Sequence, residues 1–339
     1  MAATMQDVAK LAGVSAKTVS NVVNNHPRVS AATRERVQDA IDKLGYELNL
    51  TARNLRQGRT GLIGVALPEL KLPYFAELAD SIICEAEAVG LRVMIEQTNS
   101  DRAREIDVLH GQRRLMTDGL IFSPLALGQE DIGLFRVDFP LVLLGERVFG
   151  SVNDHITMSN VEAAKAVTRH LLERGRRRIA VVGAHPGERV GSAALREQGY
   201  REALRDAGLP IDEALIRTTV MWHRNTGATA TDELLEDGVD FDAVFALNDT
   251  LAMGVLRSLH SHGLRVPDDV AVVGFDNIDE AAYTRPTLTS VAPGREQIAR
   301  EAVELLTLRI GETRLPLESR APIKRILADY EVVVRESSG

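Results

Sequence analysis

The sequence predicts an N-terminal all-α head carrying a helix-turn-helix, followed by an α/β body of two doubly wound parallel-sheet subdomains. Three observations support this fold class. Two short helical patterns flank a tight turn within residues 4–23, short apolar runs alternate with amphipathic helices from residue 61 onward, and the two parts carry opposite net charge. A chain of 339 residues is also too long for one typical domain.

The head begins with two helix-start signals. Thr4 and Asp7 have the spacing at which two side chains satisfy the free backbone N–H groups of a first turn. Ser15 is suited to cap a second helix after a tight turn at residues 13–15. One face of that second helix is apolar and is expected to bury against Val8 and Leu11, through Val19, Val22 and Val23. The other face is small, polar and basic, and is expected to face outward with Ala16, Lys17, Ser20 and Asn21.

A second helix with such an outward face is shaped to enter a DNA major groove. An ordinary helical hairpin remains the alternative for these residues alone. A third helix is predicted over residues 31–44, with Ser30 at its start, Gly45 as a left-handed C-cap, and apolar residues at helical spacing between them.

Charge separates the two parts. Residues 1–60 hold nine Lys and Arg against five Asp and Glu, a net charge of +4, although the whole chain has −8. A basic head attracts phosphates, whereas an acidic body is repelled by them. This asymmetry predicts that only the head binds nucleic acid.

The body alternates strands and helices. Seven apolar runs are predicted as buried strands: LIGVAL, LRVMIEQ, GLIFS, PLVLLG, RRIAVVG, DAVFAL and DVAVVGF. Amphipathic helices lie between them, and such alternation predicts parallel sheets covered by helices on both faces. The order repeats in two halves, 61–159 and 160–291.

The ordered motifs resemble the LacI/GalR family of bacterial transcription repressors over nearly the whole chain. They are MQDVAKLAGVSAKTVSNVVN and TRERV in the head, then PYFAEL, DGLIFSP, REQGYREAL, FALNDTLAMG, VPDDVAVVGFDN and PTLTSV. The resemblance implies a head over 1–46, a hinge over 47–60, and a periplasmic-binding-protein-like body whose subdomains are joined by three crossovers. It assigns 61–159 and 292–322 to the first subdomain, and 160–291 and 323–336 to the second.

The resemblance also implies a homodimer that binds a near-palindromic DNA operator. Residues expected to reach base edges are Ala16, Lys17, Asn21 and, more weakly, Arg28; those expected to contact phosphates are Thr4, Thr18, Ser20 and Asn24. The family often has Arg at the position of Asn21, whereas Asn favours adenine. In the hinge, which is expected to fold on the operator, Leu55 is expected to enter a minor-groove step with Arg53 and Arg56 near phosphates. Asn49 and Ala52 complete the predicted hinge contacts, and a linker packed on the body is the alternative role of Leu55.

Eight residues at predicted strand ends match positions where the family contacts its effector: Tyr74, Phe75, Ser123, Arg147, Arg196, Trp222, Asn248 and Asp276. An aromatic face with Asp, Asn and Arg side chains is the chemistry that binds a sugar. Structural alternatives stay open for five of them. Trp222 would be core, Asp276 a helix cap, Arg196 a surface ion pair, and Tyr74 and Phe75 helix packing. Asp249 is expected to cap the next helix instead of contacting ligand.

Other protein classes lack support in the sequence. The enzyme motifs for a nucleophile elbow, a phosphate-binding loop, a zinc protease and a dinucleotide fold are absent, so neither an enzyme nor a cofactor is expected. The histidines show no metal-ligand spacing, and the single cysteine, Cys84, fits a reducing cytoplasm. No apolar run of membrane-spanning length is present, so no membrane partner is expected. A purine-responsive or other co-repressor-dependent regulator, a non-regulatory sugar-binding module and a nonspecific DNA binder remain the alternatives.

Overall fold

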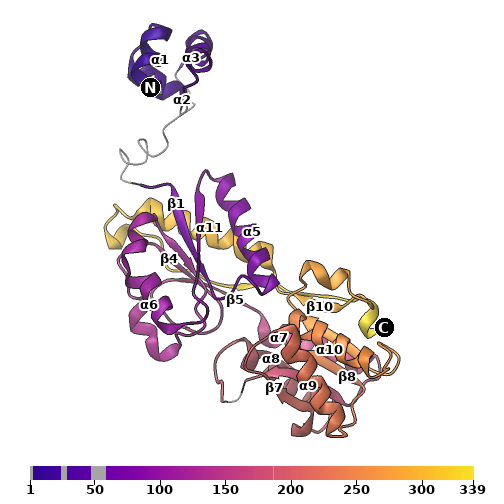
Figure 1. Ribbon diagram of the computed structural model, residues 1–339. Coiled ribbons are helices and arrows are strands. Elements are labelled where there is room, and N and C mark those ends of the chain that lie inside the picture. Colours follow the sequence, from indigo (N-terminus) through magenta and orange to yellow (C-terminus); the bar gives the residue numbers. More distant parts are fainter. Residues whose placement is uncertain (1–2, 24–28, 47–58, 186) are drawn as a thin grey trace. The chain divides into compact units, whose positions relative to one another are not determined.

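The computed structural model describes residues 3–23, 29–46, 59–185 and 187–339. The chain divides into two units, residues 1–60 and residues 61–339, which are described separately (Figure 1).

The head unit contains three helices, α1 (Met5–Ala12), α2 (Ala16–Val23) and α3 (Ala31–Leu44). The predicted capping box is present, because the Asp7 amide donates to the Thr4 hydroxyl and the Thr4 amide donates to the Asp7 carboxylate at 2.9 Å. The Ser15 hydroxyl accepts from the Thr18 amide at 3.1 Å and so caps α2. Gly13 and Gly45 adopt the left-handed conformation that ends α1 and α3.

The head has its own small core, which differs from the prediction at two positions. Val8, Val19 and Val37, one from each helix, are completely buried there. Leu11 was expected in this core but is 52% exposed, because Ala9 and Ala12 take the inward positions of α1. Ala16, expected to face outward, is half-buried and packs against the same core at the start of α2.

The first subdomain of the body is built on a six-stranded parallel sheet in the order β11-β5-β4-β3-β1-β2. Helices α5 and α11 pack on one face of this sheet and α6 on the other. The bounds of the elements are β1 (Leu62–Leu67), α5 (Pro73–Ala88), β2 (Arg92–Gln97), α6 (Arg102–His110), η1 (Gln112–Met116), β3 (Leu120–Phe122), η2 (Gln129–Phe135), β4 (Leu141–Leu144), β5 (Asp154–Met158), α11 (Arg295–Glu312), η5 (Leu317–Ser319) and β11 (Arg325–Ala328).

The second subdomain repeats this plan with the order β12-β10-β9-β8-β6-β7. Helices α7 and α8 pack on one face and α9 and α10 on the other; β12 is the one strand of this sheet that runs antiparallel. The bounds are α7 (Asn160–Glu173), β6 (Ile179–Ala184), α8 (Ser192–Asp206), η3 (Glu213–Leu215), β7 (Ile216–Thr218), α9 (Arg224–Glu236), β8 (Ala243–Ala246), α10 (Asp249–Ser261), β9 (Ala271–Phe275), η4 (Asp279–Ala282), β10 (Thr289–Ala292), β12 (Glu331–Val333) and η6 (Glu336–Ser338).

Three segments cross between the subdomains, after β5, after β10 and after β11. The expected boundary at 322/323 is wrong, because β11 pairs in parallel with β5 and so still belongs to the first subdomain. The chain returns to the second subdomain only with β12. The strand expected over LRVMIEQ is also not fully buried, since β2 lies at the edge of its sheet.

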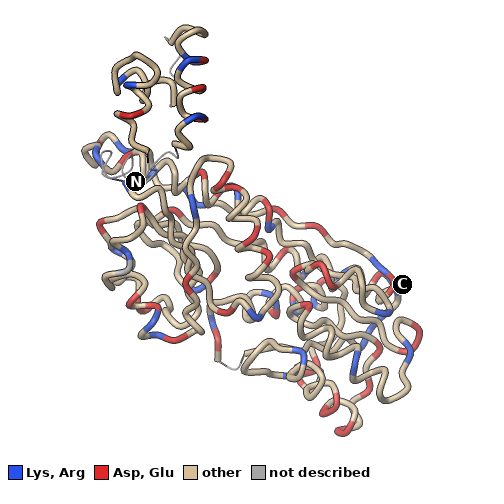
Figure 2. The backbone as a smooth tube through the Cα atoms, turned by 45° about the horizontal axis from the view of Figure 1, so that its top comes forward, with Lys and Arg blue, Asp and Glu red and all other residues tan. Residues whose placement is uncertain are grey.

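In both sheets the first strand lies between the second and the third, β1 between β2 and β3 and β6 between β7 and β8, so the connections from that point run in opposite directions along the sheet. Ligands bind outside the carboxyl ends of the strands at such points. Figure 2 shows acidic and basic residues interspersed along the backbone of the body.

Candidate functional site

The body contains a cavity of about 350 Å³ at the carboxyl ends of its strands. Its lining follows β1, β3 and β4 of the first subdomain and β6, β8 and β9 of the second. All eight residues predicted for effector contact line it: Tyr74, Phe75, Ser123, Arg147, Arg196, Trp222, Asn248 and Asp276. The volume falls within the range of small-molecule sites.

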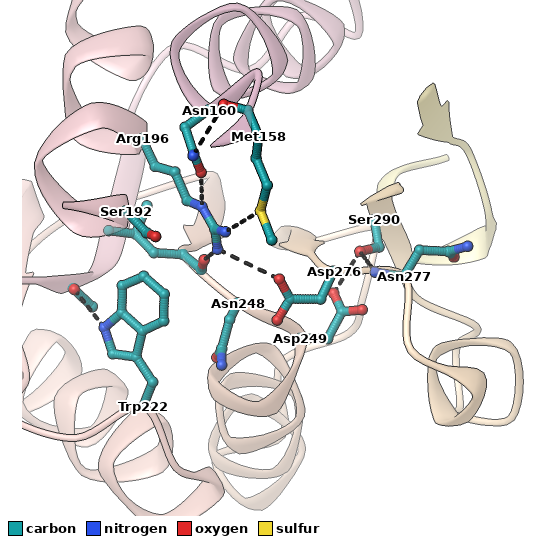
Figure 3. Close-up of polar contacts among 12 residues, drawn as sticks. Met158, Asn160, Ser192, Arg196, Trp222, Asn248, Asp249, Asp276, Asn277 and Ser290 are labelled. Atoms are coloured by element: carbon teal, nitrogen blue, oxygen red, sulfur yellow. Dashed lines mark hydrogen bonds and ion pairs between the residues drawn. The ribbon is translucent and has the colours of Figure 1, made fainter. Parts of the chain in front are cut away.

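Arg196 and Asp276 form a buried ion pair on the wall that the second subdomain provides (Figure 3). The Arg196 guanidinium lies 3.6 Å from the Asp276 carboxylate and is 2% exposed as a residue, which excludes the surface ion pair considered for it. Its Nε donates to the Asn160 side chain at 2.7 Å, Nη1 donates to the Leu247 carbonyl, and its plane lies 3.5 Å from the centre of the Phe275 ring. These contacts fix the guanidinium in one orientation.

Asp276 has a buried carboxyl and an unfavourable backbone conformation. Burial raises the pKa of its carboxyl to about 7, against the opposing effect of Arg196. Its φ of 113° lies in a region that residues other than glycine rarely adopt. Asp276 does not cap the following short helix, which begins at Asp279 with no side-chain cap. Its carboxylate instead points toward Arg196 in the cavity wall (Figure 3).

Asp249 supports this turn from behind. It is completely buried, accepts from the Ile278 amide at 3.0 Å and accepts from the Ser290 hydroxyl at 2.6 Å. Ser290 in turn accepts from the Asn277 amide at 3.0 Å. Asp249 therefore does not cap α10, as was expected of it, but fixes the turn that presents Asp276.

The cap of α10 is Asn248. Its side-chain oxygen accepts from the Leu251 amide at 2.7 Å, and the residue also lines the cavity. Trp222 lies nearby, donates its ring N–H to the Gly183 carbonyl at 2.8 Å and has the Arg196 guanidinium 5.3 Å from its ring centre. Trp222 is half-buried and packs against the core, so the core role and the cavity role coexist in one side chain.

The first subdomain contributes an aromatic pair at the start of α5. Tyr74 and Phe75 meet edge to face, with ring centres 5.3 Å apart. Burial raises the pKa of the Tyr74 phenol, and the nearby Asp276 and Glu146 carboxylates raise it further. Both rings pack in the core and also line the cavity. Ser123 follows β3 and is buried.

Several cavity residues were missed in the sequence, and most of them join the two subdomains. The Ser192 hydroxyl donates to the Glu146 carboxylate at 2.8 Å, Arg147 donates to the Val190 carbonyl at 3.3 Å, and His223 Nε2 lies 3.1 Å from the Glu69 carboxylate. Glu188 pairs with Arg147 at 3.6 Å and with His185 at 2.7 Å. Glu146 could have been found, because it lies two residues past the end of β4.

The face of α2 that was predicted to be exposed and polar is only partly exposed. Lys17 is exposed on α2, while Thr18, Ser20 and Asn21 are half-buried, and the Thr18 hydroxyl lies 2.9 Å from that of Ser15. Thr4 is exposed at the start of α1. Seven predicted DNA contacts lie outside the described residues: Asn24, Arg28, Asn49, Ala52, Arg53, Leu55 and Arg56.

Two further findings concern the described part of the chain. No helix there is long and apolar enough to cross a membrane. Its His, Cys, Asp and Glu side chains nowhere gather in a group of three that would hold a metal ion.

Two family models match the chain. The model of bacterial regulatory proteins of the lacI family matches residues 4–49, and the model of the periplasmic binding protein-like domain matches residues 168–338. Among curated relatives, the transcriptional regulator CelR of Thermobifida fusca is 35% identical over 98% of both chains. The transcriptional repressor PurR of Vibrio atlanticus is 31% identical over 91% of this chain and 92% of its own.

Solved structures give the same relationship. A putative LacI-family regulator from Sanguibacter keddieii is 47% identical, with a TM-score of 0.76 over 83% of this chain and all of the other. The complex of CelR with cellobiose is 32% identical, with a TM-score of 0.71 over 99% of both. The Lac repressor dimer bound to operator and an anti-inducer is 25% identical, with a TM-score of 0.80 over 100% of this chain and 99% of that one.

Proposed function

Because this chain belongs to the LacI family of DNA-binding transcription regulators, which are not enzymes, we propose that it is a homodimeric repressor whose affinity for its operator is controlled by a sugar. The single observation that carries this proposal is the cavity at the strand ends, which gathers all eight residues expected to contact an effector. A freestanding sugar-binding module would not need the helix-turn-helix head, and a nonspecific DNA binder would not need the cavity.

The head supplies the DNA contacts. Lys17 and Asn21 on α2 read base edges, Ala16 lies at the start of the same helix, and Thr4, Thr18 and Ser20 fix the register on phosphates. Two such heads in a two-fold dimer match a near-palindromic operator. The dimer of the related Lac repressor on its operator supports this arrangement. Binding to chromosomal DNA also places the protein in the cytoplasm.

The cavity supplies sugar chemistry. Trp222 offers an apolar ring to the C–H face of a pyranose, while Asp276, Asn248 and Arg196 are polar groups for vicinal hydroxyls. The solved complex of CelR with cellobiose, which is 32% identical to this chain, supports a saccharide as the ligand class. A purine or another metabolite acting as co-repressor is the second candidate, because the Tyr74–Phe75 pair would also accept a planar ring.

Control follows from where the ligand sits. It contacts Tyr74 and Ser123 in the first subdomain and Arg196 and Asp276 in the second, so it favours one relative orientation of the two. A ligand changes operator affinity only through its different affinity for the two arrangements of the protein. We expect the sugar to favour the arrangement that releases DNA.

The test combines two measurements on the full-length protein. The operator is selected from random DNA, and a thermal-shift screen against sugars and purines identifies the effector. A ligand at 100 times its dissociation constant adds about 2.7 kcal/mol of apparent stability. A sugar that stabilises the protein and releases the selected operator supports the proposal, and a purine that tightens operator binding would replace it with the co-repressor alternative.

A further inference from the structure

We propose that Arg335 is a positioning residue for the effector site: from the C-terminal segment it fixes the turn of Asp276 and Asn277 that presents the Asp276 carboxylate to the cavity. This inference rests on the proposed function, because it takes Asp276 as an effector contact. It adds a residue that neither the sequence motifs nor the relatives point to. Arg335 follows the strand β12 near the end of the chain and is not among the described residues that line the cavity.

The turn that Arg335 contacts has an unfavourable backbone. Asp276 has a φ of 113° and Asn277 a φ of 47°, so two successive residues other than glycine adopt positive φ. Asn tolerates the left-handed region better than most residues, whereas 113° lies outside that region. Such conformations persist only where the surrounding structure fixes them. The contacts of this turn therefore decide where the Asp276 carboxylate lies.

The main chain of the turn is held from within the second subdomain (Figure 3). The amides of residues 276–278 donate in order to the Val291 carbonyl at 2.8 Å, the Ser290 hydroxyl at 3.0 Å and the Asp249 carboxylate at 3.0 Å. These three bonds fix the path of the backbone. The Asn277 side chain is held separately, by the guanidinium of Arg335.

Arg335 forms a bridge between the turn and the strand β10. Its Nη2 donates to the Asn277 side-chain oxygen at 2.7 Å, and its Nη1 donates to the Leu288 carbonyl just before β10 at 2.7 Å. The Arg335 amide also donates to the Thr289 hydroxyl at 2.8 Å. A guanidinium is planar and rigid, so one that donates from both ends holds its two acceptors in a fixed relation. Asn277 is thereby restrained directly beside Asp276.

The segment that carries Arg335 is itself anchored. Ser337 and Ser338 are buried. The Ser337 hydroxyl donates to the Val272 carbonyl of β9 at 2.6 Å, and the Ser338 hydroxyl lies 2.8 Å from His170 Nε2 of α7. These bonds give the half-buried Arg335 side chain a fixed base, as a positioning residue requires.

The same segment follows the third crossover between the subdomains. β11 pairs with β5 of the first sheet and β12 pairs with β10 of the second, and only residues 329 and 330 lie between β11 and β12. Arg335 comes two residues after β12. The piece of chain that enters from the first subdomain is thus also the piece that holds the turn of the effector site.

The first test measures amide hydrogen exchange by mass spectrometry on the full-length protein without ligand. Arg335→Gln removes the bridge, so the amides of residues 276–278 should exchange about tenfold faster, while those of α10 keep their wild-type rates. Arg176→Gln is the matched control, because Arg176 is also half-buried and donates to a backbone carbonyl of the same subdomain, that of Pro267. The control should leave residues 276–278 unchanged. Wild-type exchange at 276–278 in Arg335→Gln, or faster exchange throughout the second subdomain, overturns the proposal.

A double-mutant cycle shows whether Arg335 acts through Asn277. Asn277→Gly removes the side-chain acceptor, and glycine adopts positive φ without strain. In the Asn277→Gly background, Arg335→Gln should cause less than a twofold further change in the exchange of the Ile278 amide, because the shared contact is already lost. If the two substitutions speed exchange independently, so that their factors multiply, Arg335 does not position the turn through Asn277 and the proposal fails.

The second test measures effector affinity with glucose, galactose and cellobiose as probes. Trp222 is the single tryptophan of the chain and lines the cavity, so its fluorescence reports binding there. For each sugar that binds wild type, Arg335→Gln should bind about tenfold more weakly and Arg176→Gln equally well, with operator affinity unchanged in both without sugar. Equal sugar affinity in Arg335→Gln and wild type overturns the proposal. If no sugar binds wild type, the proposed sugar effector fails, whereas hydrogen exchange still decides whether Arg335 positions the turn.

Discussion

At the scale of single residues, Asp276 combines two features: a conformation that is energetically unfavourable and a position in the proposed ligand site. Its backbone is strained, its carboxyl is buried, and a network of Asp249, Ser290 and Asn277 holds it in place. Strained and buried polar groups persist where the surrounding structure fixes them and where function uses them. The network explains how a non-glycine residue remains at this turn.

Replacing Asp276 with Asn should separate ligand binding from DNA binding. Asn tolerates positive φ and keeps the shape of the side chain but loses the charge. The loss of charged hydrogen bonds to two hydroxyls should weaken effector binding by about 1.5–3 kcal/mol, measured by calorimetry. Operator affinity without effector should be unchanged. Asp279→Asn, an exposed carboxyl in the same loop, is the matched control and should bind effector like wild type.

The raised pKa of Asp276 predicts that the stability of the fold and the affinity for effector change with pH in opposite directions. The folded protein holds the proton up to a pH of about 7, above the ordinary value for Asp, so this group stabilises the fold fully at acid pH. That contribution is lost as the pH rises through 7. Effector binding needs the carboxylate and should be about tenfold tighter at pH 8 than at pH 6. Thermal unfolding from pH 5 to 8 measures the change in stability, and calorimetry over the same range measures the change in effector affinity. If stability and affinity depend on pH in Asp276→Asn as they do in wild type, the pH dependence does not come from Asp276.

The sequence predicted three site residues that lie within two residues of the end of a strand, Ser123, Asn248 and Asp276, because the end of a parallel strand fixes the position of the next residues. It missed Glu146, which lies in the same kind of position after β4. The prediction that Asp249 caps α10 is wrong, because Asn248 is the cap; an N-cap preference does not say which of two adjacent acceptors lies at the boundary. His185 and Glu188 lie on a loop whose path depends on tertiary contacts, and no local pattern marks them.

At the scale of elements, two glycines let α9 and α10 cross closely beneath the site. A Cβ at Gly254 would lie 2.0 Å from the Arg224 carbonyl, and one at Gly227 would lie 2.3 Å from the Leu251 carbonyl. These helices begin next to Trp222 and Asn248, so their crossing sets where both side chains enter the cavity.

Gly254→Ala should therefore destabilise the body and disturb the site together. The added methyl group meets backbone atoms that cannot move aside, which costs about 1–3 kcal/mol. We expect a lower thermal midpoint and weaker effector binding. Gly311→Ala is the matched control, because its Cβ meets nothing within 4 Å and the helix α11 should gain about 0.5–1 kcal/mol. A Gly254→Ala midpoint at or above wild type would show that the helices can separate without cost.

The recognition role of α2 is tested by Lys17→Ala and Asn21→Ala. Both should lower affinity for the selected operator more than for random DNA, by about 1–3 kcal/mol per lost base contact. Lys10→Ala, which removes an exposed charge from α1, should lower affinity for both DNAs by a similar factor. Fluorescence anisotropy with both DNAs measures the difference. If the α2 variants lose the same amount of affinity for the operator and for random DNA, these residues contact only phosphates and do not read bases.

Long apolar strands and amphipathic helices could be predicted from the sequence, and the seven expected strands are present. The short strands β5, β7, β10, β11 and β12 were not among them, because their three to five residues depend on neighbouring strands more than on a pattern of their own. The position of β11 was missed for the same reason: Arg325–Ala328 is half-exposed and its place is set by pairing with β5.

At the scale of the whole molecule, the proposed function divides two tasks between two units. The basic head of residues 1–60 is proposed to bind DNA, and the acidic body of residues 61–339 is proposed to bind the effector between its subdomains. Hydrogen bonds and ion pairs across the cavity, such as Glu146 with Ser192 and Glu69 with His223, join the subdomains at the place where a ligand enters. An effector that replaces these contacts has the means to shift the orientation of the subdomains.

The most direct test of this account follows an operator-bound dimer while effector is added. The labelled operator is the one selected from random DNA, and the effector is the sugar that stabilises the full-length protein. We expect wild type to release the operator as the effector saturates the cavity, and Asp276→Asn to release it only at a concentration about tenfold or more higher. Release of the variant at the wild-type concentration, or no release of wild type by a ligand that saturates the cavity, would contradict the central claim.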